Sequence, residues 1–207
     1  PLTGNEIGVL LGHAVLTLGP QEGGAQRLVA ASIVSSPQLE RRWGASSRNG
    51  AWTGRSLLKA TRMQVSDVRR LEDASFSYSS LSGWEDRDRL EDVLSLMRRC
   101  WRTRAYGDFW SYMLVAEGAV DIAAEPELEV YDMAALDVIV REAGGSFTSL
   151  DGSAGPWGGN AVASNGHLHD AALAFLGGLP DDAGDDPDQP RSGPGSVSDL
   201  RSRRPRD

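Results

Sequence analysis

The chain has a single cysteine, no long hydrophobic run and no excess of positive charge. Cys100 cannot form an internal disulfide, which favours a reducing, cytoplasmic setting and a small buried side chain. No run approaches the roughly 18 apolar residues of a transmembrane helix, and residues 1–15 lack the basic start of a signal peptide. The net charge of −8 argues against nucleic acid or an anionic membrane as the main partner, because both are bound through dense positive charge.

The remaining composition fits one globular domain. The chain has 207 residues, of which 40% are hydrophobic, enough for a sizeable core. Residues 180–207 are different, because they combine seven acidic residues and five arginines with many glycines, prolines and serines. Such a segment cannot bury enough apolar surface to fold. We therefore predict a domain over residues 1–179 and a disordered tail over residues 180–207.

The first third of the chain shows patterns typical of β-strands. Apolar, β-branched runs at residues 14–18 and 28–35 flank the turn GPQEGG, which predicts a hairpin. Short strands at residues 42–45 and 50–52 are predicted around the turn signal Asn49-Gly50. Residues 63–66 and 74–80 alternate apolar and polar residues, as half-buried strands do.

The rest of the chain mixes helices and strands. The period of apolar residues predicts a surface helix over 84–103 and a second helix that begins after Gly107 and ends at Gly118. Strand 119–125, a helix that begins at or just after Asp132 and ends at Gly144-Gly145, strands 146–150 and 161–164, and a helix over 167–176 follow. The turn Asp151-Gly152 and a glycine-rich loop separate the last two strands. This alternation predicts an α/β or layered α+β fold.

Asp132 is the first residue that carries a functional question. It stands at the predicted start of a helix with a continuous apolar arc, opposite which Asp137 and Arg141 form an i,i+4 pair. An aspartate at a helix start caps free backbone N–H groups and stabilises the helix by about 1 kcal/mol. A carboxylate in this position, beside the carboxyl end of a strand, is also suited to hold a hard divalent cation. The pattern alone leaves both interpretations open.

Other candidates have equally plain alternatives. Gly107 could be a turn glycine, Asp108 a helix cap, and Glu125 an exposed strand end before Pro126. Arg104 could meet a phosphate or be one more solvated arginine. Three histidines (His13, His167 and His169) share no metal-binding spacing with other ligands, and the last two are expected to flank a helix start.

Three segments together resemble the second half of the inositol monophosphatase family. They are GAWTGRSL, then RAYGDFWSYMLVAEGAVDIAAEPELEVYDMAALDVIVREAGG, then GGNAVASNG. The family pattern, Trp-Asp-x-Ala-(Ala/Gly) opening a helix that ends in Glu-Ala-Gly-Gly, occurs here as residues 131–135 and 142–145, with Tyr131 replacing the tryptophan. The likeness covers roughly residues 30–176 and is nearest to the bacterial histidinol-phosphatase branch.

The resemblance implies a layered αβαβα sandwich and Mg²⁺-dependent hydrolysis of small phosphomonoesters. It implies that Asp132 binds metal and that Gly107, Asp108 and Phe109 offer backbone N–H groups to the substrate, as suits an anion at a helix N-terminus. Glu125 matches an acidic position that contacts polar groups of the substrate, and would suit the amine of histidinol phosphate as readily as a sugar hydroxyl. Arg104 is a further phosphate-binding candidate. The family often dimerises, so a homodimer is possible.

The family's remaining metal ligands, a glutamate pair and Asp-Pro-(Ile/Leu)-Asp-Gly-Thr, do not occur in this sequence. Residues 1–5, PLTGN, are similar to the tail of the second motif, with Thr3 at the position of its second aspartate. Several oxygen ligands are needed to hold Mg²⁺ and activate water, so one aspartate is insufficient. We therefore expect a chain truncated at its N-terminal side, with impaired histidinol-phosphate phosphatase activity. The alternatives are an inositol 1-phosphate or other sugar phosphatase, and an inactive relative that serves as a binding module.

Overall fold

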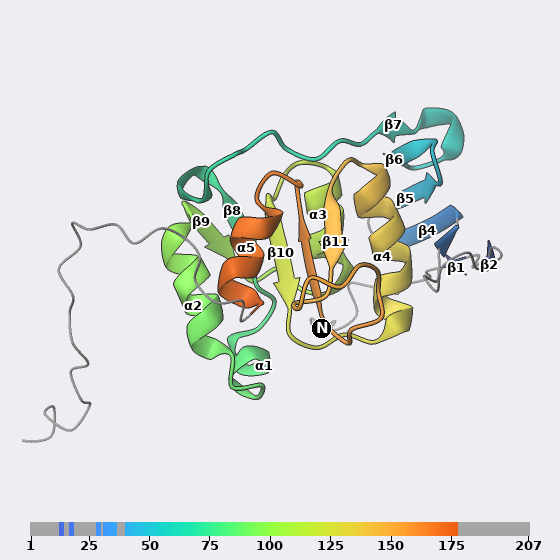
Figure 1. Ribbon diagram of the computed structural model, residues 1–207. Coiled ribbons are helices and arrows are strands. Elements are labelled where there is room, and N and C mark those ends of the chain that lie inside the picture. The colour runs from blue at the N-terminus through green and yellow to red at the C-terminus, as the bar shows by residue number, and fades with distance from the viewer. Residues whose placement is uncertain (1–12, 15–16, 19–27, 30, 37–39, 178–207) are drawn as a thin grey trace, which may run out of the picture.

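The computed structural model describes residues 13–14, 17–18, 28–29, 31–36 and 40–177, which form two sheets with helices between and beside them (Figure 1). The first sheet has the order β1-β4-β5-β6-β7, and all its pairs are antiparallel. Its strands are β1 (His13–Ala14), β4 (Ala31–Ser36), β5 (Arg41–Ser46), β6 (Gly50–Gly54) and β7 (Thr61–Arg62). A separate hairpin joins β2 (Thr17–Leu18) to β3 (Leu28–Val29).

Both predicted hairpins are confirmed, whereas the predicted strand over residues 63–66 is wrong. Residues 63–66 leave the first sheet and cross toward the second in an irregular path. Two isolated backbone bonds guide this path, because Met63 N–H donates to the Ala51 carbonyl (2.8 Å) and Val65 N–H to the Ala143 carbonyl (3.1 Å). The alternating pattern therefore reflects a crossing segment that is anchored at alternate residues. The predicted disordered tail and residues 1–5 lie outside the described residues.

The second sheet has the order β11-β12-β10-β8-β9. Strand β10 pairs with β8, and β8 with the edge strand β9, in parallel, while β12 runs antiparallel to both of its neighbours. The strands are β8 (Ser75–Ser77), β9 (Arg102–Arg104), β10 (Ile122–Glu125), β11 (Ser146–Thr148) and β12 (Ala161–Ser164). Parallel strands end at the same edge of a sheet, so β8, β9 and β10 all direct their carboxyl ends to one side.

Helices α3 (Asp108–Ala116) and α4 (Val130–Glu142) lie between the two sheets (Figure 1). Helices α2 (Leu90–Arg99) and α5 (His169–Leu176) cover the other face of the second sheet, and α1 (Leu81–Glu85) precedes α2. Two 3₁₀ turns, Leu57–Lys59 and Leu71–Asp73, complete the described elements. The predicted layered α+β class is confirmed.

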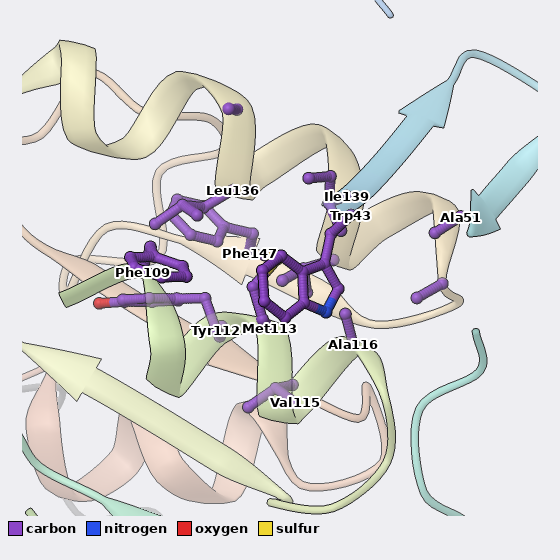
Figure 2. Packing of buried hydrophobic residues seen from close by; sticks show 14 of the residues in the cluster. Trp43, Ala51, Phe109, Tyr112, Met113, Val115, Ala116, Leu136, Ile139 and Phe147 are labelled. Carbon is purple, nitrogen blue, oxygen red and sulfur yellow. The ribbon is translucent and has the colours of Figure 1, made fainter. Parts of the chain in front are cut away.

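Two apolar clusters follow from this layering. Figure 2 shows the one between the sheets, in which the fully buried Trp43 of β5 meets Phe109 edge-on at a centroid distance of 5.9 Å. The second cluster lies between the outer face of the second sheet and α2 and α5. Strand β10 serves both, because Ala123 faces the first cluster while Ile122 and Ala124 face the second. Burial on both faces explains why this strand is a short, continuous apolar run.

The helix predicted over residues 84–103 is shorter and interrupted. Helix α1 ends at Glu85, and Asp88, with a positive φ of 56°, lies in the turn that separates it from α2. The predicted stripe holds over Leu90, Val93 and Met97, but Trp101 is exposed and Thr103 belongs to β9. The spacing of apolar residues by three and four continues to Trp101, although α2 ends at Arg99.

Helix α4 also differs from its prediction, because no polar face is exposed over residues 133–140. Asp137 is fully buried, and its Oδ2 accepts a bond from the Arg141 guanidinium at 2.7 Å. Burial raises the pKa of Asp137, which the Arg141 charge opposes. The two sheets and α3 enclose α4 on several sides, so the helical wheel could not identify a solvent face.

The Glu-Ala-Gly-Gly motif at the end of α4 is a structural corner. The Glu142 carboxylate accepts the N–H groups of Arg48 in the β5–β6 turn (2.9 Å) and of Gly50, the first residue of β6 (3.0 Å). Gly144 has a φ of +94°, and a Cβ on Gly145 would lie 2.5 Å from the Ser164 carbonyl oxygen. The motif therefore joins α4 to both sheets without any catalytic group.

Among the described residues, no helix combines the length and the apolar character needed to cross a membrane.

The close contact at Gly145 predicts that Gly145→Ala lowers the free energy of unfolding by about 2 kcal/mol or more, because the new methyl group meets the rigid backbone of β12. Gly107→Ala is the matched control, since a Cβ at Gly107 would meet nothing within 4 Å. Urea unfolding of the two variants checks this. Equal destabilisation would contradict the packing described for the corner.

Candidate active site

The carboxyl ends of β8, β9 and β10 meet at one edge of the second sheet, and α3 and α4 both begin there. The first N–H groups of each helix lack acceptors within the helix and carry partial positive charge. Open α/β sheets bind ligands in the crevice outside the carboxyl ends of their strands. Three of the predicted site residues (Asp108, Glu125 and Asp132) lie at this edge, which we call the carboxyl edge.

Glu125 ends β10 and is the most buried of the three acids, with 7% of its surface exposed. Burial raises the pKa of Glu125 to about 7, the Ser79 hydroxyl opposes that rise, and the Asp108 and Asp132 carboxylates add to it. The alternative that Glu125 is only an exposed strand end is therefore wrong. A buried carboxylate between two other acids is typical of a functional site.

Tyr112 lies beside Glu125 and was not identified from the sequence. Its side chain is fully buried, and its ring packs on Phe147 at a centroid distance of 5.8 Å. Figure 2 shows its hydroxyl at the outer end of the cluster, pointing away from the packed rings. Burial raises the pKa of Tyr112, and the Glu125 carboxylate adds to the rise. The two groups influence each other but are not in hydrogen-bonding geometry, so Tyr112 Oη and Glu125 Oε1 have no partner among the described residues.

Asp132 lies in the first turn of α4. The helix begins at Val130, two residues before Asp132, whereas the sequence predicted a start at or just after Asp132. Glu129 is the N-cap, and its N–H donates to Asp132 Oδ2 at 3.3 Å, as in a capping box. Asp132 is half-buried, and its second carboxylate oxygen can still face a ligand. The two interpretations of Asp132 are therefore geometrically compatible.

Gly107 is the N-cap of α3, and Asp108 is its first residue, so the alternative of Asp108 as the cap is wrong. Gly107 has an ordinary φ of −118°, whereas Asp108 lies in the left-handed region with φ of 51°. The Phe109 side chain is buried in the aromatic cluster, which leaves only its backbone N–H for a ligand. The start of α3 thus presents backbone donors together with one exposed carboxylate.

Ser77 at the end of β8 holds this region together. Its Oγ donates to the Tyr106 carbonyl at 3.3 Å and lies 3.0 Å from Ser111 Oγ, which connects β8 to both sides of the Gly107 turn. On the other flank an ion pair joins Arg87 to Glu127, between the α1–α2 loop and the β10–α4 loop. The serines of residues 74–80 were assigned only to a strand, and nothing in their pattern identified this role.

The opposite edge of the same sheet offers a contrast. Asp121, just before β10, accepts bonds from Ser66 Oγ (2.5 Å), Ser75 N–H (2.6 Å) and Ser75 Oγ (2.8 Å). The Asn165 side-chain amide donates to Ser66 Oγ (3.0 Å). This buried carboxylate is fully satisfied within the protein, as a structural acid should be. Glu125, at the other end of the strand, is not.

The other candidates lie apart from these acids. Arg104 is exposed at the end of edge strand β9 and donates to the neighbouring Thr103 carbonyl at 2.8 Å. His169 is buried between Thr148 (2.9 Å) and Ser164 (3.0 Å), and burial lowers its pKa. His167 contacts Asp67 at 3.2 Å. Cys100 is half-buried, less than predicted, and burial raises its pKa to about 12, which disfavours the reactive thiolate form.

A divalent cation needs several oxygen ligands, and only part of such a set is present. Asp132 can supply one carboxylate oxygen at the carboxyl edge. Within the described residues, no group of three or more His, Cys, Asp or Glu side chains is arranged to hold a metal ion. The described residues therefore fit one ligand of a magnesium site but do not form a complete one.

Comparisons with known proteins agree with this arrangement. A model of the inositol monophosphatase family matches residues 24–177. A histidinol-phosphatase of Streptomyces coelicolor is 61% identical over 156 residues, which cover 75% of this chain and 58% of that protein. A histidinol-phosphatase of Mycobacterium tuberculosis is 56% identical over 144 residues, covering 70% and 55%. The chain thus spans somewhat more than half the length of these relatives.

Solved structures show the same fold. A Thermotoga maritima inositol monophosphatase aligns with a TM-score of 0.61 and 26% identity, covering 70% of this chain and 55% of that one. The inositol monophosphatase of Anabaena aligns with a TM-score of 0.63 over 73% of this chain and 60% of that one, at 22% identity.

The raised pKa of Glu125 predicts a specific pH dependence of stability. Because the folded pKa of about 7 exceeds the ordinary 4.5, the neutral form stabilises the fold, and this contribution is lost as the pH rises from 4.5 to 7. Glu125→Gln removes the ionisation, so it should raise the free energy of unfolding by about 2 kcal/mol more at pH 8 than at pH 5.

Urea unfolding of the wild type and the variant at both pH values checks this. Glu85→Gln, at an exposed glutamate of α1, is the control and should show no such difference. An effect of Glu125→Gln that is the same at pH 5 and pH 8 would contradict the burial of a carboxylate here.

Proposed function

Because the chain belongs to the inositol monophosphatase family, we propose that it carries the second half of a Mg²⁺-dependent phosphomonoesterase site whose substrate is histidinol phosphate. The observation that supports this most is the convergence of Glu125, Asp132 and the start of α3 at the carboxyl edge. The identities of 61% and 56% to two histidinol-phosphatases support this substrate over inositol 1-phosphate or another sugar phosphate.

Each residue has a role in this proposal. The N–H groups of Gly107, Asp108 and Phe109 bind the substrate as an anion-binding helix N-terminus. Glu125 accepts from the polar end of the substrate, and Arg104 is a candidate for an outer phosphate contact. Asp132 is one ligand of the cation, which when bound neutralises the phosphate and activates water. The three acids of the carboxyl edge would repel a phosphate without such a cation.

A second candidate function, a binding module without hydrolysis, is favoured by the incomplete metal site of the described residues. Calorimetric titration with Mg²⁺ and inorganic phosphate separates the phosphatase from the binding module. Tight binding of Mg²⁺ together with phosphate would count against the binding module, because that module lacks the enzyme's cation site. The single unpaired cysteine supports a cytoplasmic setting, and a homodimer stays a prediction that sedimentation can test.

The decisive experiment is a chimera. The matched 156-residue segment of the S. coelicolor histidinol-phosphatase is replaced by the corresponding residues of this chain, and phosphate release from histidinol phosphate and inositol 1-phosphate is measured with Mg²⁺. We expect Mg²⁺-dependent hydrolysis with a higher kcat/KM for histidinol phosphate. The 207-residue chain alone should release little phosphate, because only one metal ligand lies among its described residues.

In the chimera, Asp132→Asn should lower the rate by at least about 100-fold, because it removes a cation ligand. Asp170→Asn, at an exposed position in the first turn of α5, is the matched control and should leave the rate unchanged. A folded chimera that hydrolyses neither substrate, or an Asp132→Asn chimera of normal rate, would overturn the proposal. A preference for inositol 1-phosphate would overturn the choice of substrate.

A further inference from the structure

His169 is an ionisable side chain that is buried at the start of α5, on the outer face of the second sheet (Figure 1). It is the first residue of the helix, and it contacts Thr148 and Ser164, the last residues of β11 and β12. Ser164 pairs with Ile122, the first residue of β10. His169 therefore lies at the edge opposite to the carboxyl edge, and it has no part in the proposed function.

Both ring nitrogens of His169 are hydrogen-bonded, and the pattern indicates which of them carries the hydrogen. Thr148 Oγ1 donates its only hydrogen to the Ser149 carbonyl (2.8 Å), so it accepts from His169 Nε2–H (2.9 Å). Nδ1 of the neutral ring then has no hydrogen and accepts from the Ser164 hydroxyl (3.0 Å). Ser164 Oγ also accepts the Gly166 N–H (3.1 Å). The neutral ring thus satisfies every group in this series of bonds.

Protonation of the ring disrupts this series at one bond. An imidazolium carries a hydrogen on both nitrogens, so Nδ1–H and the Ser164 hydroxyl hydrogen would point at each other. Ser164 is fully buried, and within the described part of the chain its Oγ has only His169 and Gly166 as hydrogen-bond partners. The hydroxyl would turn from the ring and lose its acceptor, and a buried donor without an acceptor is destabilising.

The elements packed against α5 do not supply a counter-charge for the ring. Strands β11 and β12 contain no ionisable side chain. Helix α2 also packs on α5, but the charged residues of α2 and its N-cap are paired as Arg89–Asp92, Glu91–Arg98 and Arg99–Glu72. Arg89 additionally reaches the Leu176 carbonyl, at the far end of α5 from His169.

The loops beside His169 contribute little more. Asp151 follows β11 and accepts the Ser153 N–H, and His167 precedes α5 and contacts Asp67. Asp170 on α5 is exposed, and its charge favours the protonated ring. Burial outweighs it and lowers the pKa of His169 below the ordinary 6.5. The partial positive charge at a helix N-terminus disfavours a cation in the same place.

We propose that His169 is an acid-sensitive latch: the neutral ring holds the first turn of α5 on β11 and β12, and the protonated ring releases the helix from the second sheet. The buried apolar side chains of α5 (Ala172, Leu173 and Leu176) belong to the second apolar cluster. Release of α5 uncovers that cluster and one side of α2.

The direction of the pH effect follows from the preference of the fold for the neutral ring. The stabilisation is fully present above the ordinary pKa of 6.5, and it is lost as the pH falls through the lower pKa of the attached ring. The latch is therefore closed at neutral pH and opens in mild acid. This sign is opposite to that of Glu125, whose neutral form stabilises the fold at low pH.

Amide hydrogen exchange of the ¹⁵N-labelled 207-residue chain tests the latch, through the amides of residues 172–177 that donate within α5. Their protection factors, which correct for the pH dependence of exchange itself, should fall about 5-fold to 10-fold from pH 7.5 to pH 5.5, because a released ring titrates at its ordinary 6.5. At low urea concentration, opening of α5 should depend on urea less steeply than opening of α4, because local release exposes less surface than global unfolding.

His169→Gln keeps a neutral donor and acceptor but cannot be protonated, so its α5 protection should change less than about 2-fold over the same pH range. His167→Gln, at an exposed histidine two residues earlier, is the matched control and should keep the fall seen in the wild type. If His169→Gln does not fold, ring resonances of the wild type replace it, and the titration of His169 should coincide with the loss of α5 protection.

Three results would overturn the latch. The first is α5 protection in the wild type that does not change between pH 7.5 and pH 5.5. The second is a fall that persists in His169→Gln, or one that occurs at a different pH from the titration of the ring. The third is an opening of α5 with the same urea dependence as α4, since the helix would then leave the sheet only when the whole domain unfolds.

Discussion

Helices α3 and α4 are enclosed between two sheets, and their packing fixes the positions of the candidate site residues at the helix starts, Gly107 to Phe109 and Asp132 (Figure 1). The rings of Trp43, Phe109 and Tyr112 and the apolar residues of α4 fill the space between the sheets. Because interiors are close-packed, neither helix can slide or turn without opening voids in this cluster. The start of each helix is thereby held at the carboxyl edge, beside the end of β10.

The two edges of the second sheet differ in how their buried carboxylates are paired. At one edge Asp121 is satisfied by the serines at positions 66 and 75, which locks the strands together. At the other edge Glu125 is equally buried, but its Oε1 has no partner among the described residues, and the carboxylate is close to Asp108 and Asp132. The protein accepts a cost in stability at that edge, as sites that bind charged ligands commonly do. The Glu-Ala-Gly-Gly corner resembles the first of these edges, because its residues serve packing alone.

Much of the fold was predictable, because most elements carry local signals. The hairpins, α3, α4, α5 and the strands of the second sheet other than β9 follow from turn residues and periodicity. The break at Asp88 and the irregular residues 63–66 were not predictable, since a positive φ and two isolated backbone bonds depend on tertiary contacts. The buried Asp137 was misplaced for a related reason, because a helix enclosed on several sides has no solvent face to read.

The candidate site was predictable only in part. The resemblance to a family supplied Asp132, Glu125 and the start of α3, whereas the residues alone left each with a plain structural alternative. Tyr112 was unpredictable, because a tyrosine in an apolar helix looks like a core residue until its hydroxyl is seen to lie unpaired beside a carboxylate. Its role depends on the meeting of α3 and β10, which are separate in sequence.

The central claim is that the carboxyl edge is where this chain binds a small phosphorylated amine. Titration of the ¹⁵N-labelled 207-residue chain with histidinol phosphate and Mg²⁺, followed by the backbone amide resonances, tests it most directly. We predict that the largest changes cluster at Gly107, Asp108, Glu125 and Asp132. Largest changes at the opposite edge, around Asp121 and Asn165, would contradict it.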